Sequence, residues 1–271
     1  MPQRLMITGA GGQLGARLRE LAPWATAFDR AGLDVTDAEA VREALSRHDI
    51  VINAAAWTDV DRAETAEQAA TATNGASVLA PLCTGKRLIH VSTDYVFDGR
   101  ASVPYQENSK TNPINAYGRS KLAGERAVLA AGGTVVRTAW LYDTSGRNFL
   151  TTMLKLATER DVLTVVDDQH GQPTWALALA RQLLALASSG DAPAGIYHGT
   201  CGGKTTWYGF AREIFRLSGL DPERVQPTTS DKFPRPARRP AYSVLAHGNW
   251  AAAGLAPLPP WDTTLAAVLK G

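Results

Sequence analysis

Residues 5–21 read LMITGAGGQLGARLREL, and this stretch decides the fold. A short apolar run, Leu5 to Thr8, leads directly into a turn that is followed by a helix-like segment, and glycines recur in that turn at Gly9, Gly12 and Gly15. In such a strand–turn–helix unit, one glycine permits the tight turn, one lets backbone N–H groups approach a pyrophosphate, and one lets the helix pack closely. The helix N-terminus also favours an anion. The stretch therefore predicts a dinucleotide-binding turn, with a ligand-free glycine turn as the alternative.

The first half of the chain repeats this alternation of strand and helix. The further predicted strands are Ile50 to Asn53, Leu88 to Ser92 and Thr134 to Arg137, and the longer helical patterns include Val41 to Arg47 and Ala116 to Ala130. The strands are uniformly apolar, as is typical of parallel strands that helices cover on both faces. We therefore predict an α/β fold with a Rossmann-type doubly wound parallel sheet.

The pattern changes after about residue 145. Helices are expected near Asn148 to Arg160, Trp175 to Ser188 and Thr206 to Ser218, with a short strand at Leu163 to Val166. The segment Asp221 to Pro240 is rich in Pro, Arg and Thr and is interpreted as a long ordered loop or a linker over a site. We expect a dinucleotide-binding domain over residues 1–147 and a smaller, mainly substrate-binding lobe over 148–271, some segments of which return to the first domain.

Charge and cysteine content narrow the class of partner. The 28 basic and 26 acidic residues nearly balance, so nothing indicates nucleic acid or an anionic membrane, and a small molecule is the expected partner. Cys83 and Cys201 match no metal-binding spacing, so no metal site is predicted and a reducing, cytoplasmic compartment is expected. The beginning of the chain lacks the features of a secretory leader. The apolar stretch Trp175 to Ala187 is interrupted by Arg181 and Gln182, which favours a soluble helix over a membrane span.

Acidic and small residues follow the second predicted strand, which ends at Phe28, and the third, which ends at Asn53. Asp29 and Arg30 come roughly twenty residues after the glycines, where an acid suits an adenosine ribose and an Arg suits a 2′-phosphate. A solvated turn is the alternative, and the choice between NADH and NADPH stays open. Asp34 and Val35 follow in the same loop. The third strand ends in small side chains that leave room for a flat ligand, although plain helix–strand packing explains them equally well: Ala54, Ala55 and Ala56.

A tyrosine and a lysine four residues apart mark the candidate catalytic helix. Tyr117 and Lys121 share one helix face, and we expect the ammonium to lower the pKa of the phenol so that it can transfer a proton. Thr93, after the predicted strand that ends at Ser92, is placed to hydrogen-bond a carbonyl that is being reduced, with a turn or capping role as the alternative. Asp94 is expected as a substrate contact or as a neighbour of one.

Together these motifs resemble the dTDP-4-dehydrorhamnose reductases, a branch of the extended short-chain dehydrogenase/reductases. The resemblance covers nearly the whole chain and includes MITGAGGQLG, INAAAWTDVDRAE, HVSTDYVFDG, INAYGRSKLAGE, VVRTAWLY, GRNFLTTML and RRPAYSVL. It implies an NADPH- or NADH-dependent oxidoreductase that reduces the 4-keto group of a dTDP-6-deoxyhexose, above all dTDP-4-dehydro-L-rhamnose to dTDP-L-rhamnose. It also implies that a homodimer is possible; some members form a metal-dependent dimer, but no cluster here justifies naming ligands.

The resemblance assigns roles to individual residues. Tyr117 is the implied proton donor and Lys121 the residue that holds the nicotinamide ribose, while Thr93 and Asp94 contact the sugar. Trp140 is the implied aromatic contact to the hexose, and Asn148 and Arg239 are implied to meet the nucleotide and its pyrophosphate. The residues implied to line the dinucleotide are Gly12, Gln13, Leu14, Asp29, Asp34, Val35, Ala54, Ala55 and Ala56.

The chain departs from the family pattern at three positions. Trp57 replaces the usual Tyr or His, Asp59 stands where a small residue is common, and Ala246 replaces the usual Asp. Trp57 in particular puts the identity of the sugar in doubt. A 4-ketoreductase for another dTDP-deoxysugar, of the antibiotic-sugar or dihydrostreptose type, is therefore the first alternative. The second is a non-catalytic NADP-binding regulatory subunit, which the intact set of Thr93, Tyr117 and Lys121 disfavours.

Overall fold

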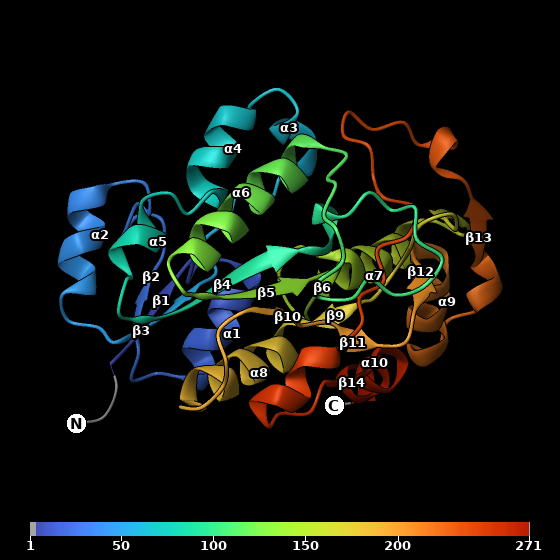
Figure 1. Ribbon diagram of the computed structural model, residues 1–271. Helices are drawn as coiled ribbons and strands as arrows, with labels where there is room; N and C mark the ends of the chain where they lie inside the picture. Colours follow the sequence, from blue (N-terminus) through green and yellow to red (C-terminus); the bar gives the residue numbers. More distant parts are fainter. Residues whose placement is uncertain (1–3, 271) are drawn as a thin grey trace.

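Six strands form the central sheet of the protein, whose computed structural model describes residues 4–270 (Figure 1). The order is β10-β5-β4-β3-β1-β2, and every neighbouring pair is parallel. The strands are β1 (Leu5–Thr8), β2 (Thr26–Phe28), β3 (Ile50–Asn53), β4 (Arg87–Thr93), β5 (Thr134–Thr138) and β10 (Ile196–His198). Because the chain passes from β1 to β2 on one side and then places β3 on the other, the topological switch point lies between β1 and β3, where open α/β sheets bind ligands.

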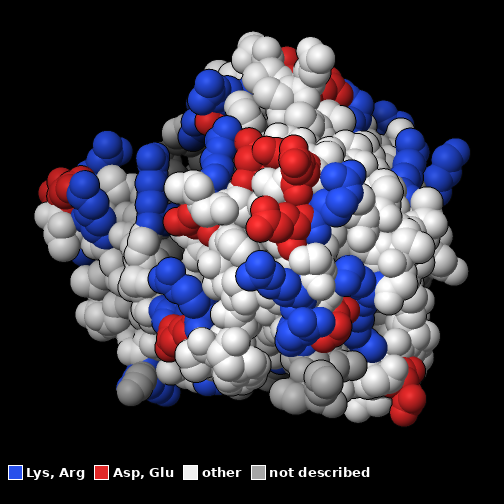
Figure 2. Space-filling model, turned by 90° about the vertical axis from the view of Figure 1, so that its left-hand side faces the viewer, with Lys and Arg blue, Asp and Glu red and all other residues white. Residues whose placement is uncertain are grey.

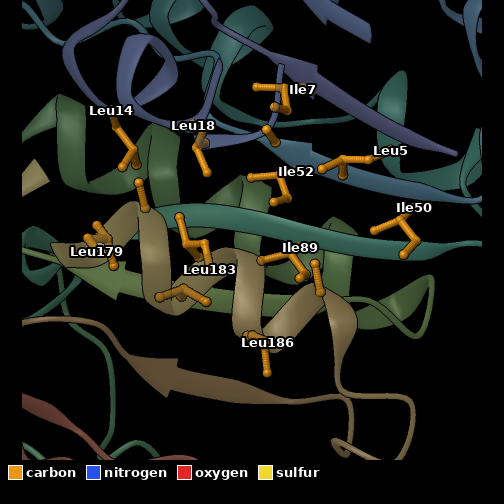
Figure 3. Packing of buried hydrophobic residues seen from close by; sticks show 14 of the residues in the cluster. Leu5, Ile7, Leu14, Leu18, Ile50, Ile52, Ile89, Leu179, Leu183 and Leu186 are labelled. Atoms are coloured by element: carbon orange, nitrogen blue, oxygen red, sulfur yellow. The ribbon is translucent and has the colours of Figure 1, made fainter. Parts of the chain in front are cut away.

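One face of the sheet packs against α1 (Gln13–Leu21) and α8 (Ala176–Ser188). Successive side chains of a strand point to opposite faces, so Leu5 and Ile7 of β1 lie on this side. Figure 3 shows them meeting the leucines of both helices, among them Leu18. Leu18 is fully buried, and burial of one leucine side chain contributes roughly 1.5–3 kcal/mol to folding. Glycine and apolar residues in the sequence of α1 thus fix its place under the switch point.

The opposite face is covered by helices from the first half of the chain. Met6, which alternates with Leu5 and Ile7, belongs to the apolar cluster on this side. The covering helices lie above the sheet in Figure 1 and are α2 (Ala38–Leu45), α3 (Val60–Ala63), α4 (Glu67–Asn74), α5 (Leu79–Leu82) and α6 (Ala116–Ala130). The two helical layers confirm the predicted α/β fold with a doubly wound parallel sheet.

A second apolar core lies at the right of Figure 1. It is built by α7 (Phe149–Glu159), α9 (Trp207–Leu217) and α10 (Trp261–Lys270), which pack around β7 (Leu163–Val166) and β13 (Val225–Thr228). The remaining elements are β6 (Leu141–Tyr142), β8 (His170–Gly171), β9 (Thr174–Trp175), β11 (Cys201–Gly202), β12 (Thr205–Thr206), β14 (Leu258–Pro260) and the short 3₁₀ helices η1 (Asp94–Val96), η2 (Pro222–Arg224), η3 (Ser230–Lys232) and η4 (Gly248–Ala253). β10, from the second half of the chain, belongs to the central sheet instead, and α8 covers one face of that sheet.

One sequence-based interpretation needs correction. The segment Asp221 to Pro240 is not a continuous loop, because its residues Val225–Thr228 form β13 and pair in parallel with β7. Pro227 within this strand hides it from a pattern search, since proline is depleted in strands and is tolerated at edges. The part that follows, from Thr229 onward, is largely irregular and runs back toward the central sheet.

The surface carries charges of both signs, and the two thiols are buried. Figure 2 shows Lys and Arg side chains interspersed with Asp and Glu on one face of the molecule, without one continuous basic area on that face. Both cysteines, Cys83 and Cys201, are free and buried. Within residues 4–270, no helix has both the length and the apolar character needed to cross a membrane.

Candidate active site

A cavity of about 890 Å³ opens at the carboxyl ends of β1, β3 and β4. It lies across the switch point of the sheet and extends to the second core. Most of the predicted site residues line it, namely Gly9, Gly12, Gln13, Leu14, Gly15, Asp29, Arg30, Asp34, Val35, Ala54, Ala55, Ala56, Thr93, Asp94, Tyr117, Lys121 and Trp140. Folding thus brings together residues from both halves of the chain in one cavity.

The glycine turn has the geometry of a phosphate cradle. Gly9 has a φ of +75°, and a Cβ on it would lie 2.5 Å from the backbone carbon of Ala54. A Cβ on Gly15 would lie 2.1 Å from the carbonyl oxygen of Gly9, so only glycine lets α1 start this close to β1. Gly12 is the N-cap of α1, and no side chain caps the helix. The first N–H groups of α1 therefore stay available for an anion, and the site fits a dinucleotide pyrophosphate.

The loop after β2 presents one acid and one cation to the same cavity. Asp29 Oδ1 accepts hydrogen bonds from the backbone N–H groups of Ala31 (3.0 Å) and Gly32 (2.9 Å), so this oxygen builds the turn while Oδ2 has no bond within the turn. Arg30 next to it is exposed. Asp34 accepts from the hydroxyl and the N–H of Thr36, and these bonds hold its pKa below the usual value. The loop can therefore meet either a ribose hydroxyl or a 2′-phosphate.

Helix α6 carries the tyrosine and the lysine. Asn115 caps the helix by accepting the N–H of Gly118 at 2.7 Å, and this fixes the first turn, in which Tyr117 lies. Lys121 is buried one turn further on and donates to the carbonyl of Val91 at 2.6 Å. Burial lowers the pKa of Lys121 to about 8, and the nearby Glu125 carboxylate opposes that shift.

The expected acidification of the phenol is not present. Burial raises the pKa of Tyr117 to about 12, while the Thr93 hydroxyl works in the opposite direction. The sequence-based expectation gave Lys121 this role, but its ammonium is engaged by the carbonyl of Val91. The phenol of Tyr117 is accordingly protonated at neutral pH.

Thr93 and Asp94 stand where β4 passes into η1. The Thr93 hydroxyl accepts the N–H of Tyr95 at 3.2 Å and donates to Asp94 Oδ1 at 3.0 Å. Thr93 therefore has the capping role considered as the alternative, and it faces Tyr117 at the same time. Asp94 is almost completely buried, its Oδ2 has no hydrogen-bond partner within the described residues, and burial raises its pKa to about 6.

Two tryptophans close the other end of the cavity. Trp140 adopts a φ of +45°, an uncommon value for a bulky residue, and such strain persists only where the surroundings fix it. Its ring stacks on Trp207 with centroids 3.7 Å apart and planes 11° from parallel. Trp207, the first residue of α9, also lines the cavity. Sequence reasoning missed Trp207, because the segment that contains it gave no signal beyond a helix start.

Two predicted residues lie outside the cavity lining. Asn148 caps α7, accepting the N–H of Thr151 and donating to the carbonyl of Asp143 at 2.8 Å. Arg239 donates to both carboxylate oxygens of Asp61. Arg147, which sequence reasoning did not select, does line the cavity and forms no ion pair with another described residue.

No residue group in the described part of the chain resembles a metal site. Among residues 4–270, no three or more His, Cys, Asp or Glu side chains gather in a way that could hold an ion. The cavity lining itself offers the hydroxyl of Thr93, the ammonium of Lys121 and the carboxyl of Asp94.

Comparisons with known proteins agree with this geometry. The family model described as "RmlD substrate binding domain" matches residues 3–271. The chain is 50% identical to the dTDP-4-dehydrorhamnose reductase of Streptomyces griseus (97% of this chain, 91% of the relative) and 48% identical to the dTDP-4-keto-6-deoxy-D-glucose reductase of Streptomyces niveus (98% and 96%). The crystal structure of a dTDP-4-dehydrorhamnose reductase from Bacillus anthracis in complex with NADP superposes with a TM-score of 0.94 at 35% identity, covering 100% of this chain and 99% of that one.

Proposed function

This chain belongs to the family of the RmlD substrate-binding domain, the dTDP-4-dehydrorhamnose reductases, and from that premise we propose that it reduces the 4-keto group of a dTDP-6-deoxyhexose with NADPH or NADH. The preferred reaction is dTDP-4-dehydro-L-rhamnose to dTDP-L-rhamnose. The observation that carries this proposal is the convergence of Thr93, Tyr117 and Lys121 in the cavity that also contains the glycine turn. A binding protein without catalysis would have no need of a proton donor at that place.

The cofactor site is assigned to the glycine turn and to the loop after β2. We propose that the N–H groups at the start of α1 hold the pyrophosphate and that Asp29 and Arg30 meet the adenosine ribose or its 2′-phosphate. The small side chains Ala54 to Ala56 leave the space between β1 and β3 open for the dinucleotide. When bound there, a reduced nicotinamide supplies a hydride to the carbonyl carbon.

The proton chemistry is assigned to residues of this chain. Tyr117 gives its phenolic proton to the C4 oxygen as negative charge develops on that oxygen. The Thr93 hydroxyl lies beside the phenol and is placed to hydrogen-bond the same oxygen. Lys121, with a pKa of about 8, is mostly charged at neutral pH and donates to the carbonyl of Val91. Its ammonium is also the proposed contact to the nicotinamide ribose.

The sugar and nucleotide contacts are proposed for the other end of the cavity. Trp140, with Trp207 stacked on it, offers an aromatic surface for the hexose, and Asp94 a carboxyl for its hydroxyls. Arg239 is the proposed pyrophosphate contact, and a bound diphosphate would compete with Asp61 for its guanidinium. Asn148 is the proposed nucleotide contact. Residues 1–147 would then serve mainly the cofactor and residues 148–271 mainly the substrate.

The deciding experiment measures NADPH and NADH oxidation with dTDP-4-dehydro-L-rhamnose, with a second 4-keto dTDP-hexose run beside it. Release of dTDP-L-rhamnose supports the preferred reaction. Turnover on the second sugar alone would assign the chain to the other 4-ketoreductases, a possibility favoured by the relative from Streptomyces niveus and by Trp57 in the cavity lining. Cofactor binding without any turnover would favour the regulatory subunit. We further propose a cytoplasmic location, in keeping with the two free thiols, and a homodimer.

A further inference from the structure

Helix α6 carries three polar side chains at intervals of four residues, so that they share one face of the helix. Tyr117 comes first, Lys121 follows one turn later, and Glu125 follows one turn after that. Tyr117 and Lys121 line the cavity, whereas Glu125 does not. Glu125 is 1% exposed, and a carboxylate buried so deeply is costly unless charged or hydrogen-bonding partners compensate it. Its partners therefore indicate its role.

The carboxylate of Glu125 is bound by two neighbouring strands of the central sheet. Ser92 of β4 donates its hydroxyl to Oε1 at 2.7 Å. Arg137 of β5 donates from Nε to Oε1 and from Nη2 to Oε2, each at 2.8 Å. Ser92 and Arg137 lie directly opposite each other in the parallel pairing of β4 with β5. Both oxygens of Glu125 are thus fixed by adjacent residues of the sheet.

Helix α6 is attached to two consecutive residues of β4. Lys121 donates to the carbonyl of Val91 at 2.6 Å, and Glu125 accepts the hydroxyl of Ser92. The next residue, Thr93, ends the strand and lines the cavity together with the proposed proton donor. The position of that phenol relative to Thr93 therefore depends on where α6 lies along β4.

Of the two attachments, only the one through Glu125 is separate from the proposed chemistry. The ammonium of Lys121 is also the proposed contact to the nicotinamide ribose, so its bond to Val91 has to share the ammonium with a ligand. Glu125 lies outside the cavity lining, and the ion pair with Arg137 holds its carboxylate. The bond between Ser92 and Glu125 does not compete with a cofactor.

We propose that Glu125 is a positioning residue, whose bonds to Ser92 and Arg137 set where α6 lies along β4. This inference rests on the proposed reductase function. In that position the phenol of Tyr117 and the hydroxyl of Thr93 serve the same carbonyl oxygen. Glu125 itself touches no ligand and transfers no proton. A buried ion pair is often no more stabilising than apolar residues of similar volume, so its specific contribution here is a fixed spacing between helix and strand.

Ser92→Ala tests this role without leaving a buried charge unpaired, because the ion pair of Glu125 with Arg137 remains. We expect kcat for the 4-keto sugar to fall about tenfold, since a small misplacement of a catalytic group is costly, while the KM for NADPH changes less than about twofold. Ser92→Cys keeps a similar shape with a weaker donor, so its kcat should lie between those of Ser92→Ala and the wild type. A raised KM for the sugar with unchanged kcat would make Ser92 a substrate contact and overturn the proposal.

Thr264→Ala is the matched control for the loss of a buried hydroxyl. Thr264 of α10 donates to the carbonyl of Pro260 at 2.9 Å and lies outside the cavity lining. This variant should lower the midpoint of urea unfolding, as Ser92→Ala also should, but leave kcat unchanged. Equal losses of kcat in the two variants would mean that reduced stability explains both, and the proposal would be wrong.

Glu125→Gln tests the same bond from the side of the helix. It should lower kcat at least as much as Ser92→Ala, and the double variant should lose little more than Glu125→Gln alone, because both changes act on one contact. Losses of kcat that multiply in the double variant would show that the two residues act independently and would contradict the proposal. If Glu125→Gln does not fold because Arg137 loses its charged partner, the variants of Ser92 still decide the matter.

A structural measurement does not need the sugar. In crystal structures of the wild type and of Ser92→Ala, both with NADPH, the phenol of Tyr117 should be displaced relative to the Thr93 hydroxyl in the variant. If the spacing of the two groups is the same in both proteins, Glu125 does not position the helix, whatever the enzyme reduces. If the spacing changes but the wild type turns over no 4-keto sugar, the proposed function fails, whereas the effect of Glu125 on the helix stands.

Discussion

Glu64 Oε1 accepts the backbone N–H of Ala116 at 2.8 Å, so a carboxylate that follows α3 holds the first residue of the helix that carries Tyr117. A negative charge at this end of a helix is stabilising, and a lost cap of this kind costs about 1 kcal/mol. We expect Glu64→Ala to lower the free energy of unfolding by about that amount and to lower kcat more than it changes the KM for NADPH, because the phenol is displaced. Glu64→Gln, which keeps an acceptor oxygen, should restore most of kcat.

A neighbouring ion pair supplies the control for this change. Arg119 of the same helix pairs with Glu67 through an exposed bidentate contact at 2.7 Å, and exposed pairs contribute about 0–1 kcal/mol. Glu67→Ala should therefore leave kcat close to the wild-type value. If both glutamate variants lose the same activity in steady-state assays, the substitutions disturb the whole helix and not its first turn. That result would contradict the proposed role of Glu64.

Tyr117→Phe removes the proposed proton donor and little else. General acid catalysis contributes roughly 10²–10⁴-fold, so reduction of the 4-keto sugar should fall by about that factor. Binding of NADPH, followed by fluorescence titration, should stay within about twofold, since the cofactor site is assigned to other elements. Tyr197→Phe, which loses a phenol bonded to the carbonyl of Pro193 on the far side of the sheet, is the matched control. Turnover that survives in Tyr117→Phe would remove this residue from the mechanism.

Local sequence patterns are sufficient to predict most of the central sheet and the helix α6, although they do not indicate the edge strand β10. The strands β1 and β3 and the helix α6 have the predicted bounds, because an apolar run or an apolar stripe next to a turn signal depends only on neighbouring residues. The glycine turn is equally local, and it carries most of the predicted cofactor site. Long-range strand pairing cannot be predicted in this way. β13 is a strand because it pairs with β7, whereas its own sequence, which contains Pro227, disfavours a strand.

The same distinction explains which parts of the site the sequence leaves open. Trp207 joins the cavity only because α9 packs its first turn against Trp140, a contact between segments far apart in the chain. Arg239 carries a phosphate-binding side chain, but its partner in the folded protein is Asp61, which no spacing rule connects to it. The direction of the pKa shift of Tyr117 likewise depends on how deeply the phenol is buried, and burial is a property of the assembled fold.

Asp29 and Arg30 should together determine whether the enzyme prefers NADH or NADPH. Asp29→Asn keeps an oxygen for the N–H groups of Ala31 and Gly32 but removes the charge that repels a 2′-phosphate. The kcat/KM for NADPH should therefore rise, and the kcat/KM for NADH should fall. Arg30→Ala removes the exposed cation and should lower kcat/KM for NADPH about tenfold, or about 1.4 kcal/mol, with little change for NADH. Steady-state kinetics with both cofactors checks this, and equal losses for both would contradict it.

Trp207 should govern the affinity for the sugar. Removing its ring uncovers one face of Trp140, whose strained backbone is fixed by its surroundings. We expect Trp207→Ala to raise the KM for the dTDP-sugar about tenfold while the KM for NADPH changes little, because aromatic stacking contributes about 0.5–1.5 kcal/mol beyond burial. Trp207→Phe keeps an aromatic ring and should recover most of the affinity. If both KM values rise, the substitution disturbs the folding of the second core and does not act through the sugar contact.

A buried histidine makes the stability of the protein sensitive to acid. His198 is fully buried, with Nδ1 placed to donate to the carbonyl of Ala246 at 2.8 Å and Nε2 placed to accept from Arg137 at 3.3 Å. Burial, reinforced by the Arg137 charge, lowers its pKa from 6.5 to about 3. Above pH 6.5 the histidine is neutral in both states and stability is complete. Below it, the unfolded chain takes up a proton that the folded protein refuses, so stability falls by about 1.4 kcal/mol per pH unit until about pH 3.

Replacement of this histidine isolates its contribution from that of the many carboxyl groups. His198→Asn should be less stable than the wild type at neutral pH, because it leaves the Arg137 contact poorly filled. As the pH falls, however, its free energy of unfolding should decline less steeply than that of the wild type, and the two slopes should differ by the uptake of one proton. Urea unfolding at a series of pH values between 7 and about 4 measures both slopes, and the carboxyl groups cancel in the difference. Parallel lines for the two proteins would mean that His198 is protonated in the folded state, and that the Arg137 guanidinium beside it does not hold the ring neutral.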